Sequence, residues 1–274
     1  MRPLVSITRA AAVAALLLSA APALAQSCGS DASGFPAWLE QFKQEAAAQG
    51  IAAQVISESL DGIGYDRNTI QHDRGQAVFR QTFEQFSGRM VPPRVKPGAN
   101  RVRQYAGLLQ RIEAQYGVPG PVLMAIWSLE TDFGANIGKF DTIRSLATLA
   151  YDCRRSEKFK AELLDALRIV QRGDLNPATM RGAWAGEIGQ TQFMPSSYIK
   201  FAVDFDGSGR RDLLHSVPDV LASTAKYLQS YGWQRGQGWE PGEPNFAVIQ
   251  QWNASAVYSK TIALLATRID EASK

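Results

Sequence analysis

Apolar residues recur every three or four positions through most of this chain of 274 residues. That spacing places side chains on one face of an α-helix, whereas a half-buried strand needs strict alternation of apolar and polar residues. Strict alternation is hardly seen. The helical pattern appears in segments that each have one apolar face: Trp38, Leu39 and Phe42; Val78 to Phe86; Tyr105 to Tyr116; Leu123 to Glu130; Phe159 to Val170; Val220 to Tyr231; and Val248 to Ile269. The chain is therefore expected to be mainly α-helical, with many short helices.

The N-terminal segment has the three parts of an export signal. Arg2 and Arg9 give it a basic start, an apolar stretch follows from Ala10 to Ala20, and Ala23-Leu24-Ala25 forms a cleavage site of the expected kind. No later segment has the roughly 18 uninterrupted apolar residues of a membrane-spanning helix. We therefore expect an exported, periplasmic protein without a transmembrane segment.

Residues 87–100 break the helical rhythm with three prolines, glycine and several basic residues. Such a composition is typical of a connection between two parts of a fold. After removal of residues 1–25, we expect the mature chain to consist of a helical lobe at about residues 30–98 and a C-terminal core at about 99–274.

Charge and cysteine content limit the classes of function. The net charge is +3 and falls to +1 without the two arginines of the export signal, so no basic surface for nucleic acid is indicated. The chain has only two histidines, His72 and His215, which argues against a histidine-based triad or a zinc site. Two cysteines, Cys28 and Cys153, would enter an oxidising compartment. One disulfide is the simplest prediction, with two unpaired thiols as the alternative.

One acid continues an apolar helix face. Leu123, Ile126, Trp127 and Glu130 are spaced by three and four residues, so the carboxyl group shares a face with large apolar side chains. Burial disfavours the charged form, and the negative end of the helix dipole, near Phe133-Gly134, acts in the same direction. A carboxyl group that resists ionisation is suited to general-acid catalysis. The alternative is a glutamate at a helix end that faces solvent.

A second constellation is the glycine-rich segment from Gly182 to Tyr198. Glycine and other small residues let the backbone approach a ligand closely. Neutral hydrogen-bonding groups beside aromatic faces favour a sugar over a phosphate or a metal, and the segment supplies them as Gln190, Gln192, Ser196, Ser197 and Tyr198, with Trp184 and Phe193. The structural alternative is a tight turn followed by a helix that starts at Pro195.

Four motifs, in their order along the chain, resemble the membrane-bound lytic murein transglycosylase B family. The resemblance covers nearly the whole mature chain from about Phe35 and is carried by Trp127 to Gly134 (WSLETDFG), Gly182 to Tyr198, Ala202 to Gly207 (AVDFDG) and Trp252 to Tyr258 (WNASAVY). It implies a lysozyme-like helical transglycosylase domain. It also implies that the partner is the glycan strand of peptidoglycan, which the enzyme would cut in cell-wall turnover or remodelling.

The resemblance also implies roles for individual residues. Glu130 would be the catalytic acid and base. Paired arginines, Arg154 and Arg155, would lie near the acidic lactyl or stem-peptide part of the substrate. The positions that match residues of the glycan cleft are Gln192, Tyr198, Tyr227, Asn253 and Tyr258.

Three positions depart from the family pattern. Ala183 stands where many relatives have Ser, Glu187 where many have a small residue, and Trp252 replaces a frequent Tyr. Because of the differences at Ala183 and Glu187, we expect the hydrogen bonding around Glu130 to differ from that of those relatives.

The number of carboxyl groups in the motifs bears on the reaction type. An ordinary glycosidase needs two carboxyl groups flanking the scissile bond, and Glu130 is the one clear candidate, since Asp132 points away from it on a helix. One acid suffices if the N-acetylmuramic acid provides its own nucleophiles, the N-acetyl carbonyl and the C6 hydroxyl, and forms a 1,6-anhydro ring. The alternatives are a hydrolytic muramidase with Glu187 as second carboxylate, and an inactive peptidoglycan-binding protein.

The segment from Asp204 to Asp212 alternates oxygen-bearing residues with glycine, like the opening of an EF-hand loop. Its twelfth position is His215 and not Glu, so Asp219 at the start of the next helix is expected to close the ligand set. The resemblance includes a calcium loop here in some family members. The predicted ligands of a structural Ca²⁺ are Asp204, Asp206, Ser208, Arg210 through its carbonyl, and Asp219; the alternative is a solvated polar turn. The reaction itself is expected to require no cofactor.

Overall fold

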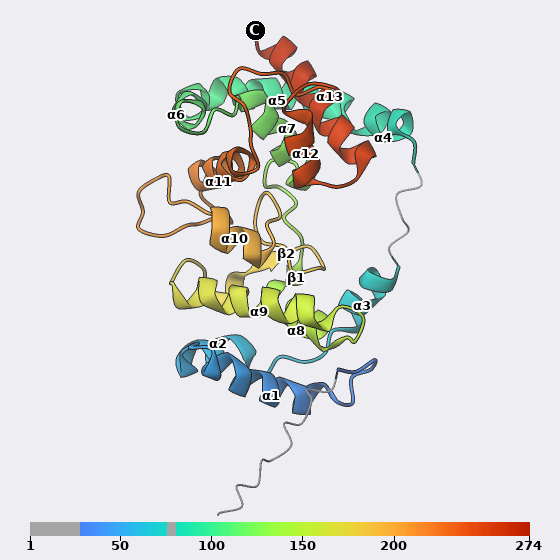
Figure 1. The fold of residues 1–274 in the computed structure, drawn as a ribbon, viewed down its shortest axis with the longest axis vertical. Coiled ribbons are helices and arrows are strands. Elements are labelled where there is room, and N and C mark those ends of the chain that lie inside the picture. The colour runs from blue at the N-terminus through green and yellow to red at the C-terminus, as the bar shows by residue number, and fades with distance from the viewer. Residues whose placement is uncertain (1–27, 76–80) are drawn as a thin grey trace, which may run out of the picture.

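The computed structural model describes residues 28–75 and 81–274. These residues are mostly helical, as the apolar spacing predicted (Figure 1). The helices are α1 (Phe35–Ala48), α2 (Ala53–Leu60), α3 (Arg67–Arg74), α4 (Phe83–Met90), α5 (Pro92–Gln104), α6 (Ala106–Tyr116), α7 (Gly120–Thr131), α8 (Thr142–Tyr151), α9 (Ser156–Gln171), the 3₁₀-helix η1 (Pro177–Thr179), α10 (Pro195–Phe201), α11 (Val217–Ser230), α12 (Phe246–Trp252) and α13 (Ala256–Ser273). The predicted export signal and the predicted helical residues Val78 and Phe79 lie outside the described residues.

One end of the elongated molecule is formed by α1 and α2 beneath α8 and α9, with α3 beside α8 (Figure 1). Phe35 and Trp38 of α1 pack against Tyr151 at the end of α8, with ring centroids 5.6 and 5.7 Å apart. The predicted disulfide is present: Cys28 is bonded to Cys153, with 4.9 Å between their Cα atoms. It ties the start of the described chain to the residues that follow α8.

The other end is built around α7, which packs against α5, α6, α11 and α13. The spacing predicted one apolar face on this helix, but nearly every side of it is buried. Glu130 is the one residue of α7 that keeps some exposure. The helix therefore places a single polar group at the boundary of an apolar core.

The prediction that residues 87–100 form an irregular connection is wrong, because α4 and α5 include most of them. Pro92 occupies the first turn of α5, where a helix has no use for a backbone N–H. Gly98 lets α5 approach α13 closely, since a Cβ there would lie 2.4 Å from Ile269. Tertiary packing thus overrides the local signal of the prolines.

The helices also group differently from the predicted division into residues 30–98 and 99–274. The helices α1–α3 pack against α8 and α9, whereas α4 and α5 pack against α13, and α5 also packs against α7. The segment before residue 98 therefore contributes to both ends of the molecule.

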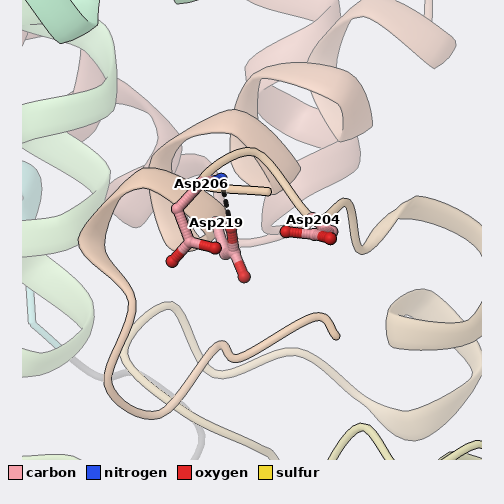
Figure 2. Close-up of side chains that lie close together, drawn as sticks. All are labelled: Asp204, Asp206 and Asp219. Carbon is pink, nitrogen blue, oxygen red and sulfur yellow. Dashed lines mark hydrogen bonds between the residues drawn. The ribbon is translucent and has the colours of Figure 1, made fainter. Parts of the chain in front are cut away.

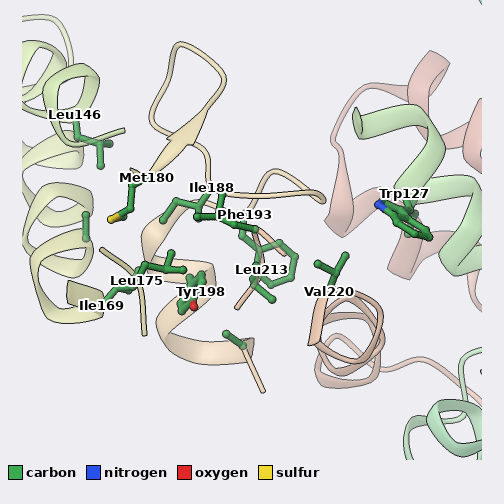
Figure 3. Close-up of a cluster of buried hydrophobic side chains, with 14 of the residues drawn as sticks. Trp127, Leu146, Ile169, Leu175, Met180, Ile188, Phe193, Tyr198, Leu213 and Val220 are labelled. Carbon is green, nitrogen blue, oxygen red and sulfur yellow. The ribbon is translucent and has the colours of Figure 1, made fainter. Parts of the chain in front are cut away.

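A middle layer joins the two ends. The strands β1 (Phe140–Asp141) and β2 (Arg181–Gly182) form a short antiparallel pair, and α10 follows them. The buried apolar side chains in Figure 3 extend from Leu146 and Ile169 through the middle layer to Trp127 and Val220, and include Met180, Ile188, Phe193, Tyr198 and Leu213. No helix in residues 28–75 or 81–274 is long and apolar enough to span a membrane.

Candidate active site

An open pocket of about 310 Å³ lies at the exposed end of α7. Its walls come from α7, from the turn between β2 and α10, from α11, and from the end of α12. The residues that line it are Glu130, Glu187, Thr191, Gln192, Phe193, Met194, Ser197, Tyr227, Trp252 and Asn253. The glycine-rich segment from Gly182 to Tyr198 and the segment that carries Asn253, both singled out in the sequence, therefore meet at Glu130.

Glu130 receives two hydrogen bonds on the same carboxyl oxygen. The Trp252 indole Nε1 and the Tyr258 hydroxyl each donate to Oε1, both at 2.9 Å. Burial raises the pKa of Glu130 to about 7; the two hydrogen bonds oppose this rise, and the negative charge of Glu187 adds to it. A carboxyl group with this pKa is present in both protonation states near neutral pH, so it can give and take a proton.

The end of α7 is held in place by contacts with other helices and loops. Arg94 of α5 donates from Nε to the Ser128 carbonyl at 3.0 Å and forms an ion pair with Asp132. The Trp127 indole donates to Gln190 Oε1 at 2.9 Å. Asp132, the left-handed residue directly after α7, thus pairs with Arg94, and the orientation of the helix end is defined on two sides.

Three predicted cleft residues line the pocket, although each already has a hydrogen-bond partner in the fold. Gln192, in the left-handed region at φ 54°, accepts at Oε1 from the Ala183 N–H at 3.1 Å. The Tyr227 hydroxyl donates to the Gln251 carbonyl at 2.7 Å, and Asn253 Oδ1 accepts from the Ser255 N–H at 2.9 Å. These bonds pre-organise the wall of the pocket.

Tyr198 does not belong to the pocket, and its predicted role as a substrate contact is wrong. Its side chain is 0% exposed and lies in the apolar cluster of Figure 3, where its hydroxyl donates to the Arg211 carbonyl. Successive residues of a helix point in directions about 100° apart. The preceding residue of α10, Ser197, is the one that faces the pocket.

Tyr258 has a different place from the predicted one. It is not among the residues that line the pocket, and its hydroxyl donates to Glu130 Oε1. Burial is the main cause that raises its pKa well above the usual value. Tyr258 therefore remains a neutral hydrogen-bond donor over the pH range in which Glu130 titrates.

The paired arginines lie outside the pocket lining. Arg154 and Arg155 both form ion pairs with Asp73 of α3, whose side chain is 2% exposed. The arginine side chains themselves remain 51% and 37% exposed. Asp73 thus holds both guanidinium groups at the surface, and their predicted contact with the acidic part of the substrate stays a prediction.

Sequence reasoning did not anticipate the role of Trp252. In the sequence, Trp252 belongs to the apolar face of a helix. The only other feature that could have indicated a special role is that it replaces a Tyr frequent in the family. In the structure its ring packs against Tyr227, with centroids 5.0 Å apart, while its N–H reaches Glu130. The residue therefore combines a wall of the pocket with a hydrogen bond to the acid.

The predicted calcium loop brings three carboxylates together (Figure 2). Oxygen atoms of Asp204, Asp206 and Asp219 lie within 4.8 Å of one another. The Asp219 carboxylate accepts from the N–H groups of Phe205 and Asp212 at 2.7 and 2.8 Å. Carboxylate oxygens at this spacing are the ligands that a hard cation such as Ca²⁺ prefers.

The other two predicted calcium ligands bond to each other. The Ser208 hydroxyl donates to the Arg210 carbonyl at 3.1 Å. A hydrogen bond from Ser216 to Asp206 is the main cause that lowers the pKa of that carboxyl group, so it is ionised at neutral pH. The loop therefore presents a negative cluster at the surface.

A helical fold with one protonatable glutamate at the end of a buried central helix defines the lysozyme-like class of domains. Within this class, the family model described as "Transglycosylase SLT domain" matches residues 34–243, and the chain belongs to that family. It is 37% identical over 226 residues to membrane-bound lytic murein transglycosylase B of Escherichia coli, an alignment that covers 71% of this chain and 62% of that protein.

Solved structures agree with this assignment. SltB3 from Pseudomonas aeruginosa, solved in complex with NAG-NAM-pentapeptide, superposes with a TM-score of 0.82 at 33% identity, covering 86% of this chain and 79% of that one. The E. coli transglycosylase Slt35, solved in complex with calcium, has a TM-score of 0.77 at 24% identity and covers 90% and 96%. The second likeness shows a shared fold.

Proposed function

We propose that this protein is a peptidoglycan lytic transglycosylase that cleaves the β-1,4 bond between N-acetylmuramic acid and N-acetylglucosamine. The observation that carries the proposal is Glu130, a carboxyl group with a pKa of about 7 in a pocket lined by neutral polar and aromatic side chains. Trp252 and Tyr258 both donate to its Oε1, so Oε2 is the oxygen available to carry the proton to the substrate.

In the first step, Glu130 gives its proton to the glycosidic oxygen and the bond from that oxygen to C1 breaks. The carbonyl oxygen of the neighbouring acetamido group bonds to C1, which places the positive charge on an oxazolinium ring. Glu130 is then a carboxylate. The N–H of Trp252 and the hydroxyl of Tyr258 stabilise its new charge in a site of low dielectric constant.

In the second step, the carboxylate takes the proton of the C6 hydroxyl while O6 bonds to C1. The bond between C1 and the acetamide oxygen breaks, which restores the acetamido group and closes the 1,6-anhydro ring. Glu130 is protonated again, and no water is consumed. A single side chain can serve both steps because its pKa lies near neutral pH.

The pocket and the relatives support this substrate. Asn253 offers an amide group and Tyr227 an aromatic face, a combination suited to an uncharged sugar. Gln192 lines the same pocket, with its amide bonded to Ala183, Ile137 and Gly189. SltB3, at 33% identity, was solved with a NAG-NAM-pentapeptide. Because peptidoglycan lies outside the cytoplasm, the predicted export signal at residues 1–25 fits a periplasmic enzyme.

Digestion of purified sacculi tests the proposal. Mass spectrometry of the released muropeptides should show anhydro-muramic ends. Reducing ends, heavier by one water, would instead identify the hydrolytic alternative, and absence of soluble products would identify an inactive binding protein.

We also propose that Asp204, Asp206 and Asp219 hold a structural Ca²⁺ with oxygen atoms from Ser208 and Arg210. The three clustered carboxylates support this ligand set, and Slt35, which shares the fold, was solved with calcium. The ion would bind the loop between α10 and α11 to the start of α11. No step of the reaction involves it.

We propose further that Arg154 and Arg155 bind the acidic lactyl or stem-peptide part of the substrate. Their partial exposure beside Asp73 supports this assignment. If it is correct, replacing both by Gln should weaken binding of peptide-bearing strands more than binding of strands without peptides.

A further inference from the structure

The pocket contains a second carboxyl group, that of Glu187, which the proposed mechanism does not use. Its backbone is held by a tight turn, because Gly182 leaves no room for a Cβ, which would lie 1.6 Å from the Glu187 carbonyl oxygen. The next residue, Ile188, exchanges two backbone hydrogen bonds with Phe193, at 2.7 and 3.0 Å. The backbone at Glu187 is therefore held in place on both sides of the residue.

The surroundings of Glu187 favour an anion more than those of Glu130 do. The Ala185 N–H donates to Glu187 Oε2 at 3.0 Å, and Lys158 of α9 acts on it with a positive charge. Burial raises the pKa of Glu187, and these two partners oppose the rise. Glu130 has no cation among the groups that shift its pKa. Of the two carboxyl groups, Glu187 is therefore the one that has a backbone N–H donor and a positive charge beside it.

The proposed reaction creates a positive charge that an anion could stabilise. When the acetamide oxygen bonds to C1, the charge spreads over the oxygen, carbon and nitrogen of the new ring, and the N–H becomes a stronger donor. A carboxylate that accepts from this N–H orients the carbonyl oxygen toward C1. This hydrogen bond is strongest in the transition state. An interaction that is stronger there than in the ground state lowers the barrier.

We propose that Glu187 is a second catalytic residue, which lines the same pocket as Glu130 and accepts a hydrogen bond from the N–H of the substrate's 2-acetamido group. The inference rests on the proposed transglycosylase function. It requires no additional reactant: the N–H proton stays on nitrogen throughout, and Glu187 remains a carboxylate in both steps. The chemical group that it recognises is a secondary amide beside the anomeric carbon.

Two variants of Glu187 and one control test the inference. In Glu187→Ala we expect kcat on soluble glycan strands to fall about 10- to 100-fold, the size of one charge-assisted hydrogen bond, with KM changed by less than about two-fold. Glu187→Gln keeps an oxygen acceptor, so its kcat should fall less than that of Glu187→Ala. Glu157→Gln makes the same chemical change on an exposed part of α9, in a residue paired with Lys160, and should leave kcat unchanged.

The pH profile gives a readout that a purely structural role would not move. Loss of the charge of Glu187 lowers the pKa of Glu130, so the alkaline limb of kcat against pH should move to lower pH in Glu187→Gln. The charged groups near these acids are Lys158, which acts on Glu187, and Arg94, which acts on Tyr258. The neighbouring tyrosines, Tyr227 and Tyr258, do not titrate in this range, because burial raises their pKa values above the usual range.

The outcomes separate this inference from the proposed function. A wild-type enzyme without anhydro products would overturn both. Anhydro products from the wild type, with Glu187→Ala equal to it in kcat and pH profile, would overturn the role of Glu187 alone. Reducing ends that the wild type makes and Glu187→Ala does not would also overturn it, because Glu187 would then act as a base toward water.

Discussion

Glu130 and Asp219 are both carboxyl groups packed at the end of a helix, yet the fold uses them in opposite ways. Glu130 lies at the C-terminal end of α7, where the helix dipole disfavours a negative charge, and Asp219 lies in the first turn of α11, where the dipole favours one. Glu130 receives hydrogen bonds from two side chains. Asp219 receives them from three backbone N–H groups, those of Phe205, Asp206 and Asp212.

Burial alone therefore does not account for the difference between Glu130 and Asp219. Burial raises the pKa of both groups, but three backbone donors hold Asp219 in a structural role within a loop. Glu130 instead borders a pocket that a substrate can enter. The two groups differ in the number and origin of their donors and in access to a pocket, which are the features expected to separate the proposed catalytic acid from a structural one.

The largest expected effect on activity follows from replacing Glu130. Glu130→Gln should lower activity on sacculi about 10³-fold, the scale of general acid–base catalysis, because an amide cannot transfer the proton. Quantifying anhydro-muropeptides by mass spectrometry measures this. More than a tenth of wild-type activity in the variant would remove Glu130 from its role.

The same variant should be more stable than the wild type at high pH. Folding raises the pKa of Glu130 from 4.5 to about 7, so its contribution to stability is fully present below pH 4.5 and is lost as pH rises toward 7. The difference should reach on the order of 3 kcal/mol above pH 7. Urea unfolding at pH 4 and pH 8 measures it, and an equal difference at the two pH values would contradict the raised pKa.

Replacing Asp219 should lower the stability of the fold. Asp219→Ala leaves three backbone N–H groups without their acceptor, which we expect to lower the free energy of unfolding by about 3 kcal/mol. Thermal and urea unfolding without added calcium test this. The control is Asp61→Ala, which removes an exposed ion pair with Lys43 and should cost less than about 1 kcal/mol. Equal losses of unfolding free energy in Asp219→Ala and Asp61→Ala would contradict a structural role for Asp219.

Removing one of the two donors to Glu130 should change the pKa of its carboxyl group. In Trp252→Phe the carboxylate loses a hydrogen bond that lowers its pKa, so the alkaline limb of the pH profile should move to higher pH. This direction is opposite to that expected for Glu187→Gln. We expect kcat at the optimum to fall about two- to ten-fold. A limb that stays at the wild-type pH would show that the indole N–H does not act on the acid.

Calcium should have the smallest effect. If the ion binds Asp204, Asp206 and Asp219, millimolar Ca²⁺ should raise the melting temperature by about 2–4 °C, the shift that corresponds to about 1 kcal/mol in a domain of this size. Asp206→Asn should remove the shift and leave the melting temperature without calcium nearly unchanged. Titration calorimetry with no heat at millimolar calcium would refute the site.

Several features could be predicted from the sequence because they depend on local spacing. The helical class follows from a period of three to four residues, and Glu130 stood out because its position on that period is otherwise apolar. The Cys28–Cys153 bond followed from the number of cysteines, since two in an oxidising compartment leave one pairing.

Other features depend on contacts between distant segments and could not be predicted. Residues 92–104 contain three prolines, yet packing against α13 and α7 makes them a helix. Tyr198 belongs to a motif of the family, yet the rotation of α10 turns it into the core. The number of donors to Glu130, and their identity, depends on how α12 and α13 approach α7.

The helical class, the acid on an apolar helix face and the one possible cysteine pair can be read from the order and number of residues along the chain. The residues that surround that acid depend on the packing of distant helices. Trp252 and Tyr258 reach Glu130 across more than 120 positions of chain, and Glu187 faces the same pocket. The pKa of a carboxyl group depends on distances and burial in space, which neighbouring residues alone do not specify.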